Sequence, residues 1–600
     1  MLRQGFPATL VVAAIGLGLG ADSPKKKPAP LPKVEETLSQ LADVVSTGEI
    51  PVEGVGLVIG LDGTGANPEA SADRKKLVDL MQKSPEHVNA EAWLASKTTA
   101  LVRVKAKLPT GITKADRFDV DVEVPPGDAA TGLAGGRLLR VELHYVGQTK
   151  EGPMDGKVMA IASGPVLVDP GTGRDGLRKG RVLGAAHVMK DVPFTIVIKA
   201  NRKGFKSSAL IQAAINARFE QHDGIRQTKM ANAKTDEVIE LAVPPIYHQN
   251  QGRYFQVISR LPILSNDELS AQRMAKWSQT LRDPATAGDS ALRLEGLGRN
   301  SVATLKEALD DPNPTVKFFA AEALAYLDDS SGVDVLAAAA ADGPAFRSQA
   351  LAALAASDQP ASHDRLQTLM ANPSMELRYG AFSALRTLDP NHPFLGRKKV
   401  LFDQVEDPDE VEAADAMALQ LQTTPRRRPR ALPEPFSLYV VKCDGPPMVH
   451  VSRSRRREIV VFGEGQKLLT PIVVGAQGNL MLNAADGDDK VQIHRITPSR
   501  LDEPERRVSS PLEVAEVVRE AANLRASYPE ILDMLAAAGR QRNLPGPIVD
   551  DALPSASKAY DQAQLAGAPS KKDDAVGRAS LEDGKRRSIL ERLRGRGAKP

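Results

Sequence analysis

The chain has 600 residues, 42% of them hydrophobic, and at about 100 to 200 residues per domain this length predicts about three or four folding units. Its 78 basic and 75 acidic residues leave a formal net charge of +3, which excludes a strongly charged chain and restricts any nucleic-acid binding to local patches. Because Cys443 is the single cysteine, no intrachain disulfide bond can form, and the nine histidines lack the paired spacing of metal ligands.

The amino terminus has the order of a secretory signal. Arg3 is followed by an apolar run from Ala8 to Leu19, and small residues lead to Gly20. That run is too short to span a bilayer comfortably. We therefore expect a signal peptide at residues 1–20 and a Pro/Lys linker at 21–36. The alternative is an uncut helix that anchors the chain in a membrane.

Three catalytic templates have partial similarity to the stretch GVGLVIGLDGTGAN, Gly54 to Asn67. A dinucleotide fingerprint needs a helix after its glycines, but a β-branched apolar run follows Gly56. A phosphate-binding P-loop needs a lysine and a hydroxyl residue, which are absent. An acid protease needs Asp directly before Thr or Ser, whereas Gly63 separates Asp62 from Thr64. The stretch is best interpreted as a strand that ends in a glycine-rich turn.

Residues 37–264 mostly show the patterns of short strands. ALVRVKAKLP, Ala100 to Pro109, alternates apolar and basic residues, and RFDVDVEVPPG, Arg117 to Gly127, alternates apolar and acidic ones. Both patterns predict strands with one buried face, paired through complementary outer charges. Helical spacing at Ser207 to Gln221, with Ser207 or Ser208 as the cap, completes an α+β body. The residues expected on the inward face of this helix are Leu210, Ala213, Ile215 and Phe219.

Residues 265–401 are rich in alanine and leucine and contain a repeat. Leu324, Leu354 and Leu385 are separated by 30 and 31 positions. The same steps separate the basic residues Lys317, Arg347 and Arg378. Such a period is typical of stacked helical hairpins, and the units resemble short HEAT-type repeats. SALRLEGLG, Ser290 to Gly298, is a candidate degenerate first repeat, and an ordinary alanine-rich bundle is the alternative.

Strand patterns return after a linker at 402–435 that is rich in Pro and Arg at its end. FSLYVVKC, REIVVFG and TPIVVGAQGNLMLN predict strands, and Glu513 to Gly546 predicts two amphipathic helices. We assign these elements to a unit at 436–550. Residues 551–600 lack periodicity for most of their length and are expected to form a mostly disordered, basic-ended tail.

Several segments, in this order, resemble the bacterial flagellar P-ring protein family. They include VEGVGLVIGLDGTGAN, TALVRVKAKLPTGITKADRFDVDVEV, GLAGGRLLRVEL, DGKVMAIASGPV and LIQAAINARF, followed by REIVVFGEGQKLLTPIVVGAQGNLMLN and EILDMLAAAG. The resemblance covers Val44 to Leu264 and Val449 to Gly546. It implies a structural signature turn at Gly54, Gly56, Gly60, Asp62, Gly63, Thr64 and Gly65, and a structural return strand at Pro471, Gly478 and Asn479.

The chain departs from the family pattern in three ways. The repeats and the linker interrupt the two matching portions, FSLYVVKC is an extra strand, and Cys443 cannot reproduce the cysteine pair that members often carry. We expect a β-rich, ring-forming body in two sequence halves, interrupted by an all-α solenoid of HEAT-like repeats that projects as an accessory. Deletion of that solenoid is therefore expected to leave ring formation intact.

The resemblance implies a mechanical role without catalysis or cofactors. A P-ring subunit is a periplasmic bushing around the flagellar rod at the peptidoglycan layer, so the implied partners are other copies of the chain, rod and L-ring proteins, and peptidoglycan. The alternative is a secreted envelope scaffold or adaptor that binds a protein partner through its helical repeats. An envelope hydrolase using Asp62 is not supported, because no paired acid emerges.

Two features suggest contacts with anionic surfaces, although solvated linkers and hairpins often carry such charges. One is the basic tail segment Lys585 to Arg596, in which Ile589, Leu590 and Leu593 have helical spacing. The other is a pair of arginine runs that contain Arg426, Arg427, Arg428, Arg455, Arg456 and Arg457. Nucleic acid is not an expected partner of an exported chain.

Overall fold

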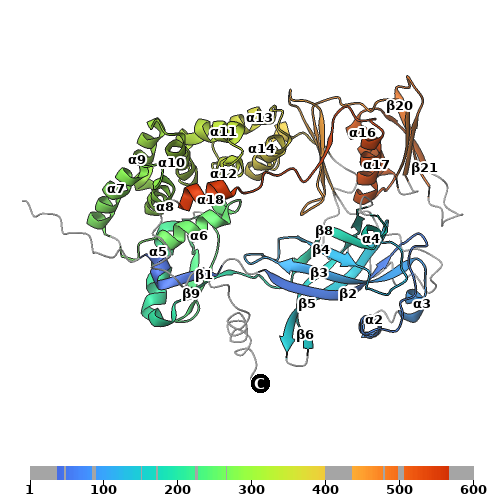
Figure 1. Cartoon of the computed structure of the whole chain (residues 1–600), viewed down its shortest axis with the longest axis horizontal. Coiled ribbons are helices and arrows are strands. Elements are labelled where there is room, and N and C mark those ends of the chain that lie inside the picture. Colours follow the sequence, from blue (N-terminus) through green and yellow to red (C-terminus); the bar gives the residue numbers. More distant parts are fainter. Residues whose placement is uncertain are drawn as a thin grey trace, which may run out of the picture. The chain divides into compact units, whose positions relative to one another are not determined.

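The computed structural model (Figure 1) describes residues 37–45, 49–83, 90–149, 152–169, 173–222, 227–264, 266–398, 436–476, 480–496 and 506–565. The predicted signal peptide, both predicted linkers and residues 566–600 lie outside these ranges. Within them, no helix combines the length and the apolar character that crossing a membrane requires.

Among the described residues of the first half, seven strands form one sheet in the order β4-β3-β2-β5-β6-β8-β7. A further pairing of β4 with β8 closes the sheet on itself, which removes exposed edges and creates a shared interior. That interior contains Val102, Val120 and Val182, each at most 1% exposed. The strands are β2 (Ile50–Ile59), β3 (Thr99–Leu108), β4 (Phe118–Glu123), β5 (Arg137–Thr149), β6 (Gly152–Pro165), β7 (Leu167–Val168) and β8 (Lys179–Val188).

The pairing of β3 with β4 confirms the two strands expected from alternation. They run antiparallel, with Arg103 opposite Glu123 and Lys105 opposite Asp121. Lys105 Nζ lies 3.9 Å from Glu123 Oε2, so the outer charges are complementary as predicted. Because both side chains are substantially exposed, this ion pair contributes little to stability.

A second, smaller part of the first half combines a four-stranded sheet with helices α5 (Phe205–Phe219) and α6 (Gln251–Arg260). The sheet order is β1 (Ala42–Val45), β9 (Phe194–Ile198), β13 (Val238–Leu241) and β12 (Ala231–Ala233). Other described helices and strands of this half are α1 (Leu38–Leu41), α2 (Ala72–Lys83), α3 (Ala90–Leu94), α4 (Gly173–Leu177), β10 (Gln221–His222) and β11 (Gln227–Thr228).

Helix α5 exists as predicted, but its inward face was assigned only in part. Ile215 and Phe219 are buried, whereas Leu210 and Ala213 are exposed. The helix begins at Phe205 after Gly204, so neither predicted serine is the cap. The physical reason is that α5 carries apolar residues on more than one side, so periodicity alone could not select the buried one.

The predicted repeat region is a series of helices (Figure 1). The repeated residues Leu324, Leu354 and Leu385 are fully buried at equivalent places on α10, α12 and α14, which confirms the repeat. The helices are α7 (Asp267–Leu281), α8 (Ala287–Leu297), α9 (Val302–Glu307), α10 (Pro314–Tyr326), α11 (Val333–Asp342), α12 (Arg347–Leu354), α13 (Pro360–Leu369) and α14 (Met375–Leu388).

The repeated basic residue has a structural function in two of the three units. Arg347 Nε donates to the carbonyl oxygen of Ala340 at 2.9 Å, and Arg378 Nε donates to that of Met370 at 2.9 Å. Both carbonyls lie at the end of the preceding helix, where backbone oxygens lack partners within the helix and attract cations. Each arginine therefore fastens its own helix to the one before it.

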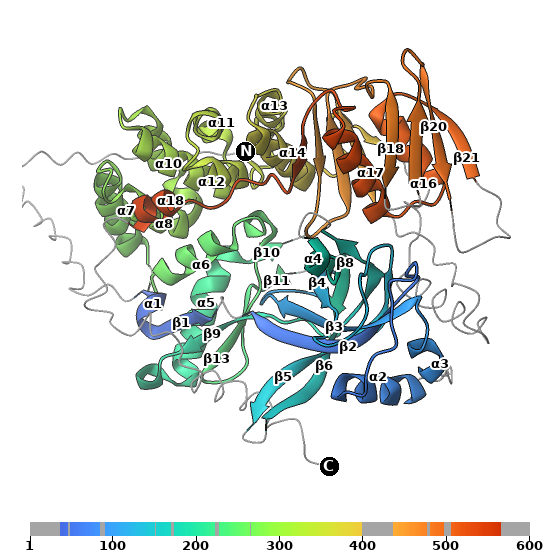
Figure 2. The same cartoon turned by 45° about the vertical axis from the view of Figure 1, so that its right-hand side comes forward.

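The described residues of the second half form two sheets and two helices (Figure 2). The strands and the two helices were predicted from the sequence, whereas their division into two sheets was not. Helices α16 (Val514–Asn523) and α17 (Tyr528–Arg540) share a core with both sheets. One sheet has the order β14 (Arg397–Lys398), β15 (Ser437–Val441), β17 (Glu458–Phe462), β16 (Met448–Val451) and β22 (Ile548–Asp550). The other has the order β18 (Ile472–Ala476), β19 (Leu480–Ala484), β20 (Lys490–Arg495) and β21 (Arg506–Pro511).

The two β-rich halves contact each other directly. Leu167 and Leu183 of the closed sheet belong to the core of the second half. The backbone N–H of Arg455 donates to Asp119 Oδ2 at 2.7 Å, which adds a polar link between β16–β17 and β4. The expectation that distant portions of the chain pack together is therefore confirmed.

The helical array is not the projecting accessory that the sequence suggested. A single core runs from the small sheet of the first half through the array to β15, β16 and β17, and includes Ile196, Leu324 and Phe462. Sequence patterns identify a repeat but not what covers its faces, which is why this expectation was wrong. Removal of residues 265–401 would uncover buried side chains on both flanks.

A helix that the sequence did not predict lies at the start of the expected tail. It is α18 (Lys558–Leu565), and its residue Tyr560 is only 3% exposed. Too short to show periodicity, the segment could not be distinguished from the chain around it. Its contacts place it in the core that contains the helical array.

Candidate functional site

The signature turn joins three segments of the closed sheet. Gly60 and Gly63 follow β2 with φ of +79° and +75°, values that favour glycine. The hydroxyl of Thr64 donates to the carbonyl of Gly132 at 2.9 Å, and the N–H of Gly65 donates to that of Lys97 at 2.9 Å. The turn thus ties the end of β2 to the segments before β3 and before β5.

Other glycines of the signature allow close backbone contact. A Cβ on Gly65 would lie 2.1 Å from the carbonyl oxygen of Thr99, and one on Gly54 would lie 2.5 Å from that of Glu142. Gly56 sits more loosely, with the nearest atom at 3.2 Å. Any side chain at the first two positions would push neighbouring strands apart. At Gly54 and Gly65 the lack of a side chain therefore permits close backbone contact within this part of the fold.

The residues of the rejected catalytic readings can be placed in the structure. Asp62 is exposed on the turn. Within the described ranges, no group of three or more His, Cys, Asp or Glu side chains is arranged to hold a metal ion. Cys443 is partly buried, and its sulfur accepts a hydrogen bond from Arg378 Nη2 at 3.3 Å.

The return strand is described only in part. Pro471 directly precedes β18, and its carbonyl accepts a hydrogen bond from the Asn543 side chain at 2.8 Å. That contact links the strand to the chain following α17. Gly478 and Asn479 lie outside the described residues, so their predicted role stays a prediction.

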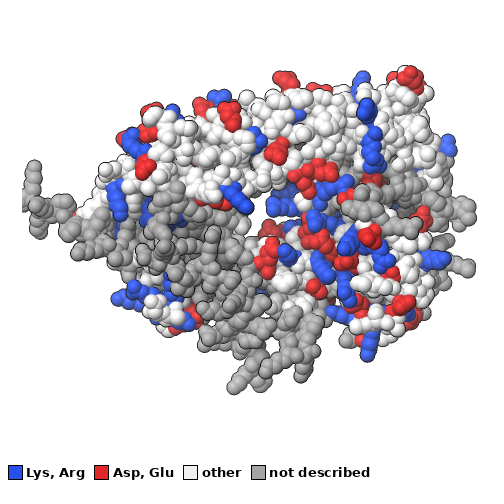
Figure 3. Space-filling view, viewed as in Figure 1, with Lys and Arg blue, Asp and Glu red and all other residues white. Residues whose placement is uncertain are grey.

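The candidate anionic-surface arginines are described only in part. Arg426, Arg427 and Arg428 lie outside the described ranges, whereas Arg455 and Arg456 are exposed between β16 and β17. Arg457 is partly buried. Its burial and the charges of Arg137 and Arg117 lower its pKa to about 10. On the face seen in Figure 3, basic and acidic side chains are interspersed.

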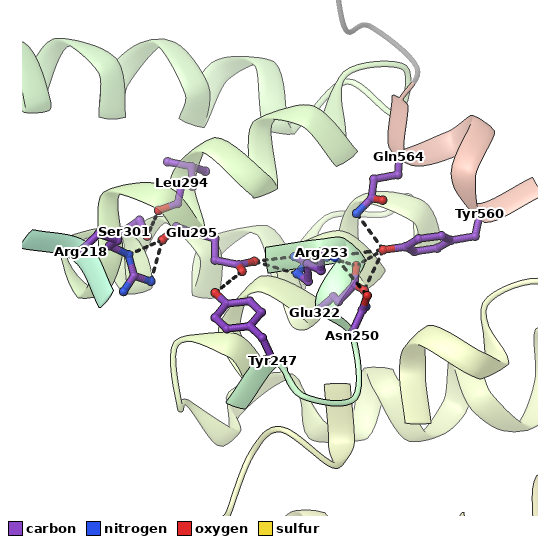
Figure 4. A network of polar contacts seen from close by, with 10 residues as sticks. All are labelled: Arg218, Tyr247, Asn250, Arg253, Leu294, Glu295, Ser301, Glu322, Tyr560 and Gln564. Carbon is purple, nitrogen blue, oxygen red and sulfur yellow. Dashed lines mark hydrogen bonds and ion pairs between the residues drawn. The ribbon is translucent and has the colours of Figure 1, made fainter. Parts of the chain in front are cut away.

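A buried charge cluster joins the helical array to the first half (Figure 4). Arg253 of α6 forms ion pairs of 2.6 Å with both Glu295 of α8 and Glu322 of α10. The side chains of all three are at most 1% exposed. Tyr247 donates to Glu295 Oε1 at 2.6 Å. Removal of one partner from such a cluster leaves an uncompensated buried charge.

Burial changes the acid–base behaviour of this cluster. Desolvation raises the pKa of Glu322 to about 7, although the charge of Arg253 and a hydrogen bond from Tyr560 oppose the shift. Glu295 faces the same arginine and adds a like charge that raises the pKa further. The cluster therefore holds a carboxyl group that can change protonation near neutral pH.

A second buried cluster joins the array to the second half. Glu458 of β17 receives hydrogen bonds from Arg386 and, at 2.5 Å, from the Tyr379 hydroxyl of α14. The Tyr379 ring stacks on His450 with 3.4 Å between centroids. Burial lowers the pKa of His450 to about 3, so this side chain is neutral and accepts a hydrogen bond from the N–H of Ala552.

Sequence analysis missed both clusters, although a signal was present. Glu322 lies within the apolar run FFAAEALAY, and Arg386 lies on a helix whose other positions are largely apolar. A charged side chain on a buried helix face needs a partner of opposite charge. The sequence pattern shows that such a partner must exist but does not show which residue it is. Arg253 and Glu458 are those partners, from segments far away in the sequence.

These contacts define an α+β scaffold in which helical repeats connect two touching β-rich halves. Residues 37–271 match the family model described as flagellar P-ring protein, and residues 302–386 match the model of HEAT repeats. Both resemblances read from the sequence are thereby confirmed for these residues. The matched P-ring family is a structural flagellar component rather than an enzyme family.

Curated relatives agree with this assignment. Two are flagellar P-ring proteins of Anaeromyxobacter dehalogenans: one, from strain 2CP-C, is 31% identical over 221 residues, covering 35% of this chain and 55% of the relative. The other, from strain 2CP-1, is 31% identical over 270 residues, covering 43% and 66%. The flagellar P-ring protein of Thermotoga maritima is 29% identical over 223 residues, covering 35% and 61%.

The chain thus spans between about half and two thirds of the length of these relatives. The family model ends at residue 271, before the array. The resemblance of Val449 to Gly546 to the family stays a prediction.

Proposed function

We propose that this chain is a structural subunit of the flagellar basal-body P ring, a periplasmic bushing around the rod at the peptidoglycan layer. The observation that carries the proposal is the match of residues 37–271 to the P-ring family. Export by the predicted signal peptide would bring the chain to the periplasm. Its partners there are other copies of itself, rod and L-ring proteins, and peptidoglycan.

The local structure suits a mechanical role. A bushing must keep its shape while the rod turns, so its subunits need a stiff core. The closed sheet satisfies its strand edges internally, and the glycine turn connects three of its segments through the Thr64 hydroxyl and the Gly65 N–H. The helical array adds stiffness, because buried ion pairs connect it to both halves.

The proposed domain division follows composition and contacts. It comprises a P-ring-like first half at 37–264, helical repeats at 265–401 and a second half at 436–550. The two halves act as one body because they share core residues such as Leu183. In this arrangement the array is a brace between them.

The alternative is an envelope scaffold that binds a protein partner through its repeats. Extended helical arrays commonly use such surfaces for partners. Here α6 and α18 already pack against α8 and α10, so a partner would have to use other helices of the array, such as α11 and α13. The observation that supports this alternative is the helical array itself, which stands between the two halves in the sequence.

Electron microscopy of the purified mature protein, alone and with rod fragments, tests the proposal. Closed rings are the expected result. Particles that stay monomeric with rod fragments present would contradict it. Capture of another envelope protein that depends on residues 265–401, without any ring, would favour the scaffold instead.

A further inference from the structure

Helix α18 packs in the core but is joined to the rest of the chain through a mostly exposed segment. The run from Leu553 to Ser557 before it is exposed or partly exposed, and α18 has eight residues. Of the side chains described in α18, Tyr560 and Gln564 are buried, at 3% and 1% exposed. A short, mostly exposed tether therefore leads to a short helix whose described buried side chains are those of Tyr560 and Gln564.

The Tyr560 side chain packs in an aromatic cluster of the array. Its ring centroid lies 5.9 to 6.2 Å from those of Phe318, Phe319 and Phe346. These separations lie in the range of favourable aromatic pairs. These three phenylalanine rings can pack against an aromatic ring, but the hydroxyl group of a tyrosine needs polar partners from elsewhere.

The polar end of Tyr560 is matched by specific partners (Figure 4). Its hydroxyl lies 2.8 Å from Glu322 Oε1 and donates to that carboxylate, while Gln564 Nε2 donates to the hydroxyl at 2.8 Å. Arg253 holds the same glutamate from the other side. Without α18, Glu322 would lose one of its hydrogen-bond donors.

The backbone of α18 also lies in close contact with α8. A Cβ on Gly288 of α8 would lie 2.6 Å from the Cα of Gln564 and 2.8 Å from its carbonyl oxygen. Only glycine permits this approach without a shift of the backbone. The site therefore selects a helix in close contact, with Tyr and Gln four residues apart on one face.

We propose that α6, α8, α10 and Phe346 form a binding site for a short helix carrying Tyr and Gln at positions i and i+4, and that α18 occupies this site as an exchangeable ligand. The occupant in trans is α18 of a second copy of the chain. Release of α18 would break the contacts of its two buried side chains, the packing of Ala563 and the close backbone contact at Gly288. The mostly exposed tether leaves the helix free to move once these contacts are broken. This inference does not depend on ring formation.

Cleavage of the tether in the folded full-length chain tests the site. A specific protease site is inserted between Ser555 and Ala556, both exposed. After cleavage, a fluorescent peptide with the sequence of residues 551–565 is titrated, and its anisotropy is measured. We expect saturable binding to the cleaved chain and at least about tenfold weaker binding to the uncut chain, because its own helix competes.

Variant peptides identify the contacts. Tyr560→Ala and Gln564→Ala peptides should bind at least about tenfold more weakly, because each loses a buried polar contact. A Lys558→Ala peptide is the matched control, because Lys558 is exposed, and its affinity should stay within about twofold. Excess unlabelled peptide should also displace the cleaved carboxyl-terminal fragment if that fragment stays bound.

Three results would overturn the proposal. The first is absence of saturable binding to a cleaved chain that keeps its circular dichroism spectrum. The second is equal affinity of the Tyr560→Ala peptide. The third is loss of the folded state on cleavage, which would show that α18 is an integral part of the core. Each of these results leaves ring formation, and so the proposed function, to be judged separately.

Discussion

The closed sheet and the helical array are held together by different means. At the signature residues of the sheet, backbone lies against backbone. A Cβ on Gly54 or Gly65 would lie 2.5 Å or 2.1 Å from a neighbouring carbonyl oxygen, so both positions require glycine. In the array, side chains make the decisive contacts, through buried leucines and through the ion pairs of Arg253 and Arg386.

This difference explains which part of each region can be read from a sequence. A close backbone contact permits one residue type, so it leaves a recognisable motif in a single chain. A buried ion pair requires two residues that are distant in sequence, so neither position reveals the other. The comparison predicts that the two regions respond differently to substitution.

The largest effect is expected from Arg253→Met. The substitution leaves Glu295 and Glu322 buried without their cation, so the free energy of unfolding should fall by about 3–5 kcal/mol. Urea unfolding followed by circular dichroism measures the change. The matched control is Arg365→Met, which removes the ion pair to Asp334 between exposed side chains and should cost less than about 1 kcal/mol. Equal effects of both substitutions would contradict the role of burial.

A somewhat smaller effect is expected from Gly65→Ala. The new methyl group would collide with the carbonyl oxygen of Thr99, and the resulting backbone shift should cost about 2–3 kcal/mol. Gly475→Ala is the control, because no atom lies within 4 Å of a Cβ built there. The same unfolding assay compares the two variants. If Gly65→Ala were as stable as its control, the steric account of the signature turn would be wrong.

The pH dependence of stability should report on Glu322. Its pKa of about 7 in the folded protein lies above the reference value of 4.5, so the folded state binds the proton more tightly. The stabilisation is complete below the reference pKa and is lost as the pH rises through about 7. We expect a loss of at most about 3 kcal/mol between about pH 5 and pH 8.

A Glu322→Gln variant tests this assignment, because it cannot titrate at that position. Stability of the two proteins is measured by urea unfolding at several pH values. The difference between wild type and variant should change with pH in the stated direction. A difference that is constant over this range would show that Glu322 does not titrate as proposed.

Much of the fold could be predicted from the sequence. Alternation identified β3 and β4 with their pairing, and a period of 30 to 31 residues identified the array. Contacts that depend on the folded arrangement could not be found this way. The ion pairs of Arg253 and the docking of Tyr560 join segments far apart in the chain. The buried side of α5 was also ambiguous, because Leu210 and Ile211 are both apolar.

The smallest effect should come from the paired outer charges of β3 and β4. Lys105→Ala removes an exposed ion pair to Glu123 and should change stability by less than about 0.5 kcal/mol. Thermal unfolding at low and high salt measures this change. A loss above about 2 kcal/mol would mean that surface charge contributes to the sheet as much as its backbone contacts do.

Imaging of flagellar motors in cells with and without the gene tests the central claim most directly. The account predicts that deletion of the gene removes the ring density around the rod at the peptidoglycan layer, and that the gene supplied in trans restores it. An unchanged ring in cells that lack the protein would contradict its assignment as a P-ring subunit.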